Sequence, residues 1–148
     1  MAASSTRHIL IVEDDGDLLE VLKFVLEDEG YRVSTAEGGA EALSAASSQE
    51  FSLVLLDVSM PDMSGIEVAK RLRADPRTAN VRLALHTGRS LAEIREQFDD
   101  FDAFIGKTEN AEDLVAAINA AVEQPARTPS RADDGRGLAM QSASEQRP

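Results

Sequence analysis

Short apolar runs alternate with segments of helical periodicity along most of the chain. The runs that predict strands lie at 8–12, 31–35, 53–56, 81–85 and 103–105. After each run, apolar residues recur three and four positions apart, as is typical of an amphipathic helix. These helical patterns lie at 18–26, 42–46, 66–73, 91–98 and 112–123. The chain therefore reads as five consecutive strand–helix units.

Five such units predict an α/β fold in which a parallel, doubly wound sheet carries helices on both faces. The runs 9–12 and 53–56 are continuously apolar and do not alternate, which indicates strands buried on both sides. The run 31–35 is shorter and more polar, so we expect it at a sheet edge. Sites in open α/β sheets form beyond the carboxyl ends of the strands.

Composition narrows the class of protein. The 148 residues correspond to one domain, and 43% of them are hydrophobic, which is enough to form a core. The net charge of −12 argues against a nucleic-acid or anionic-membrane partner. The absence of cysteine excludes disulfides, thiolate zinc sites and cysteine nucleophiles. No apolar run approaches membrane-spanning length, and residues 1–8 do not resemble a signal peptide, so we expect a cytoplasmic protein.

The two ends of the chain differ in composition from the rest. Residues 125–148 contain three prolines, no aromatic residue and a scatter of Ser, Arg and Gly, which favours disorder. We interpret residues 1–7 as a disordered N-terminus, 8–124 as the folded domain and 125–148 as a disordered tail. A tether, a partner motif or a linker to a further domain is compatible with that tail.

Polar residues stand at the carboxyl ends of four predicted strands. They are Glu13–Asp14–Asp15, Asp57, Thr87 and Lys107. Acids that converge from two strands repel one another unless a cation or a proton lies between them, and oxygen-only ligands suit Mg²⁺. A carboxylate can also act as a nucleophile toward phosphorus. Lys107 and Thr87 would then neutralise and hydrogen-bond a phosphoryl group.

These residues belong to four segments that occur in a recognisable order. The segments are Val12–Asp15 (VEDD), Leu55–Gly65 (LLDVSMPDMSG), His86–Gly88 (HTG) and Lys107. The set closely resembles the receiver domain of bacterial two-component response regulators, and in particular its stand-alone members that regulate chemotaxis. The resemblance covers roughly residues 8–123. It implies a flavodoxin-like sheet with strand order 2-1-3-4-5.

The resemblance also implies roles for individual residues. Asp57 would accept a phosphoryl group from a sensor histidine kinase or a phosphotransfer protein. Asp14 would bind Mg²⁺ directly and Glu13 largely through water, while Asp57 and the backbone carbonyl of Ser59 would complete the protein ligands. Thr87 and Lys107 would bind the phosphoryl group.

The remaining implied roles concern access and output. Gly88, which lacks a Cβ atom, would leave room for the phosphodonor. Phe104 would act as a switch aromatic that turns inward when Thr87 moves. A downstream protein would bind the face formed by the fourth helix, the fifth strand and the fifth helix. Such a protein is a signalling switch that catalyses only its own phosphorylation and dephosphorylation.

Three features depart from the family pattern. Thr108 follows Lys107 where the family usually has a proline after a cis peptide bond, and we predict a trans bond because a non-proline cis bond is costly. The segment 98–102 (FDDFD) is unusual for the expected partner-binding face. Phe104 lacks the hydroxyl group of a tyrosine.

Simpler interpretations stay open for some of these residues. Asp15 or Asp17 is expected to cap the first helix, and His86 is assigned a structural or surface role. A Mg²⁺-dependent phosphohydrolase with Asp57 as nucleophile is an alternative function. Such enzymes usually have an acid two residues after the nucleophile, where this chain has Ser59. A phosphate-independent, receiver-like scaffold is a further alternative.

Overall fold

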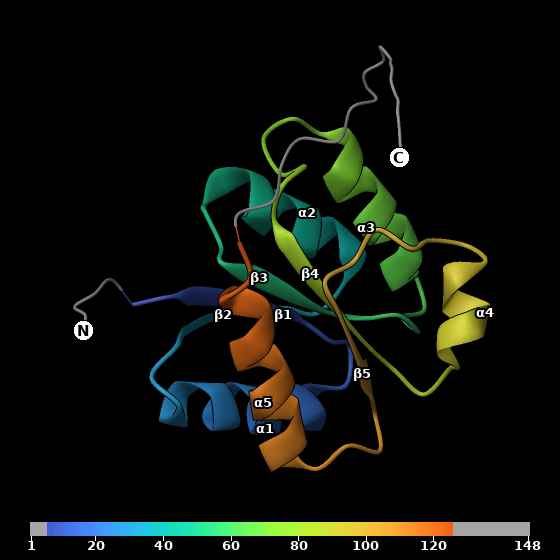
Figure 1. Cartoon of the computed structure of the whole chain (residues 1–148). Helices are drawn as coiled ribbons and strands as arrows, with labels where there is room; N and C mark the ends of the chain where they lie inside the picture. Colours follow the sequence, from blue (N-terminus) through green and yellow to red (C-terminus); the bar gives the residue numbers. More distant parts are fainter. Residues whose placement is uncertain (1–5, 126–148) are drawn as a thin grey trace.

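The computed structural model describes residues 6–125 and contains five strands and five helices within that range (Figure 1). The strands are β1 (His8–Val12), β2 (Arg32–Ala36), β3 (Leu53–Asp57), β4 (Arg82–Thr87) and β5 (Ala103–Gly106). The helices are α1 (Gly16–Asp28), α2 (Gly39–Ser48), α3 (Gly65–Ala74), α4 (Leu91–Arg95) and α5 (Ala111–Val122).

The strands form one parallel sheet in the order β2-β1-β3-β4-β5, which confirms the predicted fold class and strand order. β2 lies at an edge, as its polarity indicated. β1, β3 and β4 occupy the centre, and all five residues of β1 and of β3 are buried. Their uninterrupted apolar runs follow from this burial, because each strand is covered on both faces.

Helices cover both faces of the sheet (Figure 1), and an apolar layer lies under them on each face. α1 and α5 pack on one face through residues such as Leu22, Leu26 and Ile118. α2, α3 and α4 pack on the other face, where Leu72 and Ile94 are buried. This double cover leaves the carboxyl ends of the strands as the place where loops from both faces meet.

Local signals explain where the helices begin and end. The Asp15 carboxylate accepts hydrogen bonds from the amides of Asp17 and Leu18, so Asp15 is the expected cap of α1. Gly30, with a φ of 101°, follows α1 in the left-handed region that favours glycine. α3 ends at Ala74, and its C-cap Asp75 has the extended backbone that the following Pro76 favours.

Several expected boundaries shift by one to three residues, and one expected helix face is wrong. α4 ends at Arg95 and not at Phe98, because the amides of Gln97 and Phe98 both donate to the carbonyl of Ile94, which tightens the chain after Arg95. β4 continues through Thr87, which pairs with Gly106 of β5. On α1, Val21 is 56% exposed, whereas Leu19 is buried. The apolar stripe of α1 is wider than the sheet can cover, so packing decides which part is buried.

The expected disorder of the two ends stays a prediction. Residues 1–5 and 126–148 lie outside the described residues. At the start of the described part, the Arg7 guanidinium donates a hydrogen bond to the carbonyl of Val122, near the end of α5. No helix within residues 6–125 combines the length and apolar character that crossing a membrane requires.

Candidate functional site

The fold brings the strand-end residues named above to one edge of the sheet. Asp57 is the last residue of β3, Thr87 is the last residue of β4, and Glu13 and Lys107 directly follow β1 and β5. Because all strands are parallel, their carboxyl ends lie side by side. Residues separated by tens of positions in the sequence thus form one cluster.

Lys107 connects three strands of this cluster. Its Nζ atom lies 3.1 Å from Oδ1 of Asp57 and 3.3 Å from Oε1 of Glu13. β4 lies between β5 and β3, so the lysine side chain reaches across a whole strand to make these ion pairs. Burial lowers the pKa of Lys107, but the carboxylates of Asp57 and Glu13 outweigh it and hold that pKa above its ordinary value.

The two central acids are almost fully buried, since Glu13 and Asp57 are each 1% exposed. Burial, reinforced by the nearby Asp57 carboxylate, raises the pKa of Glu13 to about 7, although the amide of Asp15 and Lys107 oppose the shift. Oδ2 of Asp57 is buried and has no hydrogen-bond partner among the described residues. The cluster therefore holds more negative charge than its single lysine neutralises.

The donor set suits a hard divalent cation. Glu13, Asp14 and Asp57 each offer a carboxylate oxygen, and these oxygens lie within 4.8 Å of one another. With all three acids ionised, the cluster and Lys107 together carry two uncompensated negative charges. Mg²⁺ prefers oxygen ligands and keeps several waters, which the exposed Asp14 side of the cluster allows. The residues fit this ion.

Backbone amides organise the loop that follows β3. The amide of Ser59 donates to Oδ1 of Asp57 at 3.2 Å, which orients the carboxylate. This contact places Ser59 beside the cluster, as expected. A carboxyl group at this position, as in the phosphohydrolase alternative, is absent because residue 59 is a serine.

Position 65, in the segment after β3, has room only for glycine. A Cβ atom at this position would lie 2.2 Å from the carbonyl oxygen of Asp57 and 2.8 Å from Cα of Val58. The Gly65 amide also donates to the carbonyl of Val58 at 2.9 Å. The N-terminus of α3 is therefore packed directly on the backbone of Asp57.

Thr87 and Gly88 lie as expected at the end of β4. The Thr87 hydroxyl oxygen accepts a hydrogen bond from the amide of Arg89 at 3.0 Å, and the side chain is buried. Nothing lies within 4 Å of the place where a Cβ atom of Gly88 would stand. The space beside Thr87 is open at this point.

The loop that presents Lys107 is a turn with trans peptide bonds. No cis bond occurs within residues 6–125, which confirms the prediction for Lys107–Thr108. The Lys107 amide donates to the carbonyl of Thr87, and the amide of Glu109 donates to the carbonyl of Gly106. Lys107 reaches the acids from this turn without the family's proline.

His86 and Phe104 lie on opposite faces of the sheet. His86 is in register with Asp57 and lines a cavity of about 120 Å³ with Lys107, between α1 and α5. Burial, together with the positive charge of Lys107 and against the charge of Asp57, holds the pKa of His86 below its ordinary value. His86 is buried, at 5% exposure, and its assigned structural or surface role stays a prediction. Phe104 packs partly buried against the core beneath α3 and α4.

Two features of the structure were not anticipated from the sequence. Arg73 is a buried guanidinium group that binds the segments before β4 and before β5. Val21 and Phe24 are exposed on α1, at 56% and 71%. Phe24 lies near Lys23 and Glu27 on the polar side of the helical pattern, and this position could have indicated that its side chain is exposed.

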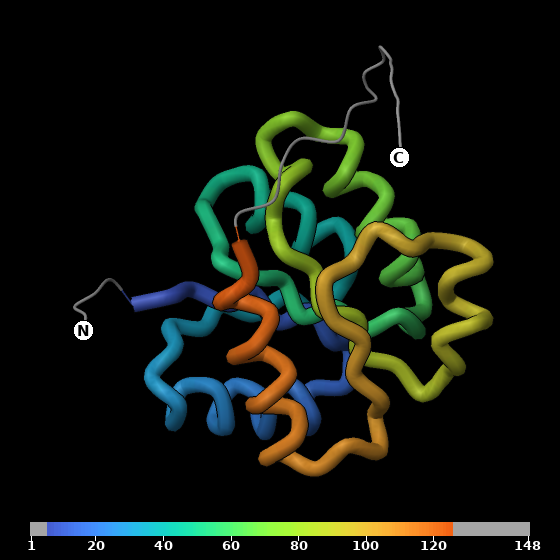
Figure 2. Tube along the Cα trace, viewed as in Figure 1, coloured from blue at the N-terminus to red at the C-terminus, as the bar shows by residue number. Residues whose placement is uncertain are grey.

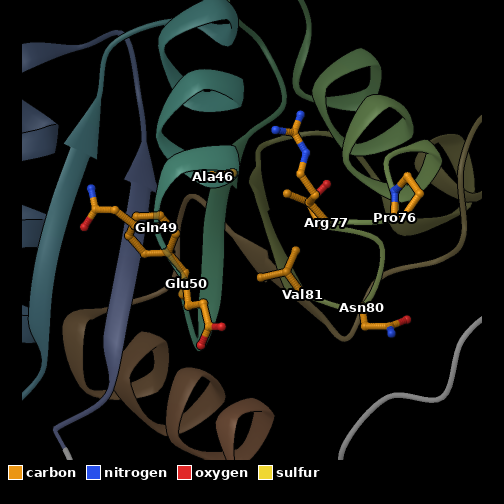
Figure 3. Close-up of a pocket in the computed structure, with 9 residues that line it drawn as sticks. Ala46, Gln49, Glu50, Pro76, Arg77, Asn80 and Val81 are labelled. Atoms are coloured by element: carbon orange, nitrogen blue, oxygen red, sulfur yellow. The ribbon is translucent and has the colours of Figure 1, made fainter.

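A cavity of about 260 Å³ lies beside the residues that precede β3 and β4, and Figure 3 shows the side chains that line it. Gln49, Glu50, Arg77 and Asn80 line it, between the end of α2 and the loop after α3. None of the strand-end residues contributes to it. It is therefore separate from the site described above.

Comparison with known families decides the class of this domain. A family model described as the response regulator receiver domain matches residues 9–119. The chain belongs to the response regulator receiver family. This receiver domain is accordingly a phospho-accepting signalling module of two-component systems, a class of switches that are generally not enzymes and that bind Mg²⁺ at an acidic pocket.

Relatives and solved structures agree with this assignment. The uncharacterized transcriptional regulatory protein YkoG of Bacillus subtilis is 42% identical over 120 residues, which cover 79% of this chain and 51% of YkoG. The DNA-binding response regulator MtrA of Mycobacterium tuberculosis is 34% identical, with 86% of this chain and 57% of MtrA covered. The chain thus spans about half the length of these curated relatives. The expectation that this chain binds no nucleic acid stays a prediction.

Among solved structures, a CheY-like receiver domain from Methanospirillum hungatei has a TM-score of 0.74 at 31% identity, covering 80% of this chain and 95% of that one. The response regulator TrrA of Thermotoga maritima, solved in complex with Mg²⁺ and BeF, has a TM-score of 0.70 at 33% identity. That match covers 78% of this chain and 99% of TrrA.

Proposed function

We propose that this receiver domain takes a phosphoryl group from a sensor histidine kinase, or from a phosphotransfer protein, onto Asp57. The observation that supports this most is the state of the Asp57 carboxylate. Its Oδ1 is held by Lys107 and by the amide of Ser59, while Oδ2 is buried and has no hydrogen-bond partner among the described residues. A carboxylate fixed at one oxygen and free at the other is prepared for attack.

In the proposed transfer, Oδ2 of Asp57 attacks the phosphorus of a phosphohistidine. A P–O bond forms, the P–N bond breaks, and its electron pair leaves with the donor's imidazole, which takes up a proton. Lys107 is already at the acceptor and balances charge on the transferred group. The Thr87 hydroxyl and the open space at Gly88 receive the phosphoryl oxygens.

Glu13, Asp14, Asp57 and the backbone carbonyl of Ser59 would hold Mg²⁺. When bound, this ion offsets the negative charge that gathers on the phosphoryl group during transfer. The two uncompensated charges of the cluster and the close approach of its three carboxylates support this ligand set. Glu13 must be ionised to take part, so its raised pKa couples metal binding to pH.

In this proposal, phosphorylation of Asp57 changes one surface of the domain, and another protein recognises the changed surface. Thr87, drawn to the phosphoryl group, would vacate space toward which Phe104 turns. The downstream partner would bind the face formed by α4, β5 and α5. We assign no reaction on an outside substrate, and no observation favours the phosphohydrolase or the scaffold.

The exposed side of α1 is the docking surface that we propose for the phosphodonor protein. Val21 and Phe24 are the large apolar residues exposed among residues 6–125. Val21 also lines the cavity that Lys107 borders, so this surface adjoins the acceptor site. A helix of a donor protein that packs here would bring its phosphohistidine to Asp57.

Labelling with a small phosphodonor tests the acceptor assignment. Wild-type protein incubated with acetyl phosphate and Mg²⁺ is expected to gain one phosphoryl group by mass spectrometry. Asp57→Asn is expected to gain none, because it lacks the nucleophile. Asp62→Asn, an exposed acid in the same loop, is the matched control and should label like the wild type. Undiminished labelling of Asp57→Asn would refute the assignment.

The docking surface is tested by comparing two donors. Phe24→Ser is expected to slow transfer from a phosphorylated histidine kinase while labelling by acetyl phosphate stays at the wild-type rate. Lys70→Ser, an exposed change on α3 and so on the other face of the sheet, is the control for a surface substitution. Equal slowing with both donors would show that Phe24 acts on the site itself and not on docking.

A further inference from the structure

Three phenylalanine rings link the switch position to α4. The ring centroid of Phe101 lies 6.3 Å from that of Phe104 on β5. It lies 6.5 Å from the ring centroid of Phe98, which follows α4. Both pairs are tilted, and their separations lie within the range over which aromatic rings attract one another. The ring centroid of Phe101 also lies 5.9 Å from the guanidinium carbon of Arg95, the last residue of α4. Phe101 is therefore in contact with both the strand and the helix.

The backbone on either side of Phe101 is anchored. Arg73 of α3 forms ion pairs with Asp100 and Asp102 at 3.2 and 3.6 Å, and it donates to the carbonyl of Asp100. The same guanidinium donates to the carbonyls of Ala79 and Val81. Figure 2 shows the chain after α4 returning over α3 toward β5. Arg73 thus ties this returning segment to the body of the domain.

α4 is held far less firmly than the segment beside it. It has five residues and is fixed at its start by a capping box of Ser90 and Glu93. Its attachment to the core depends on the buried side chains of Ile94 and Phe98. Short helices with few buried side chains are the elements that move at low cost.

Register connects these rings to Thr87. Leu85 pairs with Phe104, and Thr87 pairs with Gly106 two positions further along β5. Side chains two positions apart on a strand share one face of the sheet. Thr87 and Phe104 are therefore diagonal neighbours on the face that α3 and α4 cover.

We propose that Phe101 is the coupling residue that passes the state of Phe104 to α4 and to the exposed guanidinium of Arg95. The inference rests on the proposed function, since it starts from a movement of Phe104. When that ring turns, Phe101 loses a packed neighbour. The segment on either side of the ring cannot follow, because Arg73 binds the carbonyl of Asp100 and the carboxylate of Asp102, and the amide of Asp102 donates to the carbonyl of Leu83. The ring of Phe101 and the helix packed on it adjust instead.

Nuclear magnetic resonance of the full chain tests this coupling. Beryllofluoride with Mg²⁺ serves as the phosphoryl mimic, and backbone amide shifts are followed at Thr87, at Gly106 and in α4. In the wild type all three are expected to shift. In Phe101→Ala, Thr87 and Gly106 should shift as before, while the shifts in α4 fall to less than half. Phe101→Tyr, which keeps the ring, should restore them.

Two further variants keep the test decisive. Arg95→Gln is an exposed change that leaves the rings intact, and it should reduce the response of α4 even if Phe101→Ala does not fold. Phe51→Ala removes a partly buried ring distant from α4 and should leave the response of α4 unchanged. Full shifts of α4 in both Phe101→Ala and Arg95→Gln would overturn the coupling alone. A wild type in which Thr87 does not respond would overturn the proposed function as well.

Discussion

At the residue scale, Glu13 illustrates how one position balances opposing interactions. Its carboxyl group is buried beside Asp57, which favours the protonated form, and it also faces Lys107, which favours the ionised form. Burial outweighs the lysine, so the pKa lies at about 7 in place of 4.5. The ionised form of Glu13 is therefore unfavourable in the folded protein. A bound divalent cation would offset this cost, because its ligands are ionised acids.

The first prediction concerns the pH dependence of Glu13. A raised carboxyl pKa means that the folded state binds more protons than the unfolded state between pH 4.5 and 7. The free energy of unfolding without Mg²⁺ should therefore fall as pH rises through this window, by up to roughly 3 kcal/mol. Glu13→Gln should flatten the dependence, as measured by urea unfolding from pH 5 to 8. Equal slopes for Glu13→Gln and the wild type would contradict the assigned shift.

A second prediction at this scale concerns Gly65. Gly65→Ala would place Cβ against backbone atoms of Asp57 and Val58, which cannot rotate away. We expect a loss of about 2–3 kcal/mol in unfolding free energy, together with slower labelling of Asp57. Gly16→Ala is the control, since nothing lies within 4 Å of its added carbon. Thermal unfolding of both variants checks this, and equal stability of the two would be inconsistent with the packing described.

At the element scale, the turn between β5 and α5 sets the position of the Lys107 backbone, from which its side chain extends to the acids. The turn Gly106–Glu109 is closed by the amide of Glu109 on the carbonyl of Gly106, with Thr108 in its third position. Because the lysine stem is long and flexible, it crosses β4 from this turn without help from a proline. The family's usual proline is thus not needed to place the ammonium group.

The prediction at this scale is the effect of Thr108→Pro. Proline disfavours a helical backbone at the residue before it, which here is Lys107, and it suits the third position of a tight trans turn poorly. We expect a loss of about 1–3 kcal/mol, seen as a lower melting temperature. Thr108→Ala separates loss of the side chain from the backbone effect. A higher melting temperature for Thr108→Pro would show that the turn tolerates the family's residue.

At the scale of the whole molecule, the acidic cluster is part of a chain whose net charge is −12. A cation that binds only when the ends of β1 and β3 are brought together stabilises the folded state by mass action. At a concentration ten times its Kd, Mg²⁺ should contribute about 1.4 kcal/mol. For a domain of this size, that corresponds to a rise of roughly 5 °C in Tm.

This prediction is checked by thermal unfolding with and without millimolar MgCl₂. Asp14→Asn should lose most of the rise, because it removes one of the three carboxylates of the cluster. Glu20→Gln, an exposed acid on α1, should keep it. If Glu20→Gln lost the rise to the same extent, the effect of Mg²⁺ would be general charge screening and not binding at the cluster.

The sequence alone determined the class of fold and the membership of the site. Strand and helix periods are local properties, and five strand–helix units leave a parallel sheet as the main solution. Parallel strands bring their carboxyl ends to one edge. Polar residues at the ends of apolar runs, such as Asp57 and Lys107, could therefore be grouped from their positions in the pattern.

The tertiary structure decided which faces are buried and which distant groups meet. Helical periodicity on α1 cannot distinguish Leu19 from Val21, because the apolar stripe is wide and the rotation of the helix depends on its packing against the sheet. The ion pair of Arg73 with Asp100 and the ring contact of Phe101 with Phe104 join different segments of the chain. No pattern within either segment indicates that the two segments meet. The raised pKa of Glu13 likewise follows from burial beside Asp57, an environment that exists only after the strands have paired.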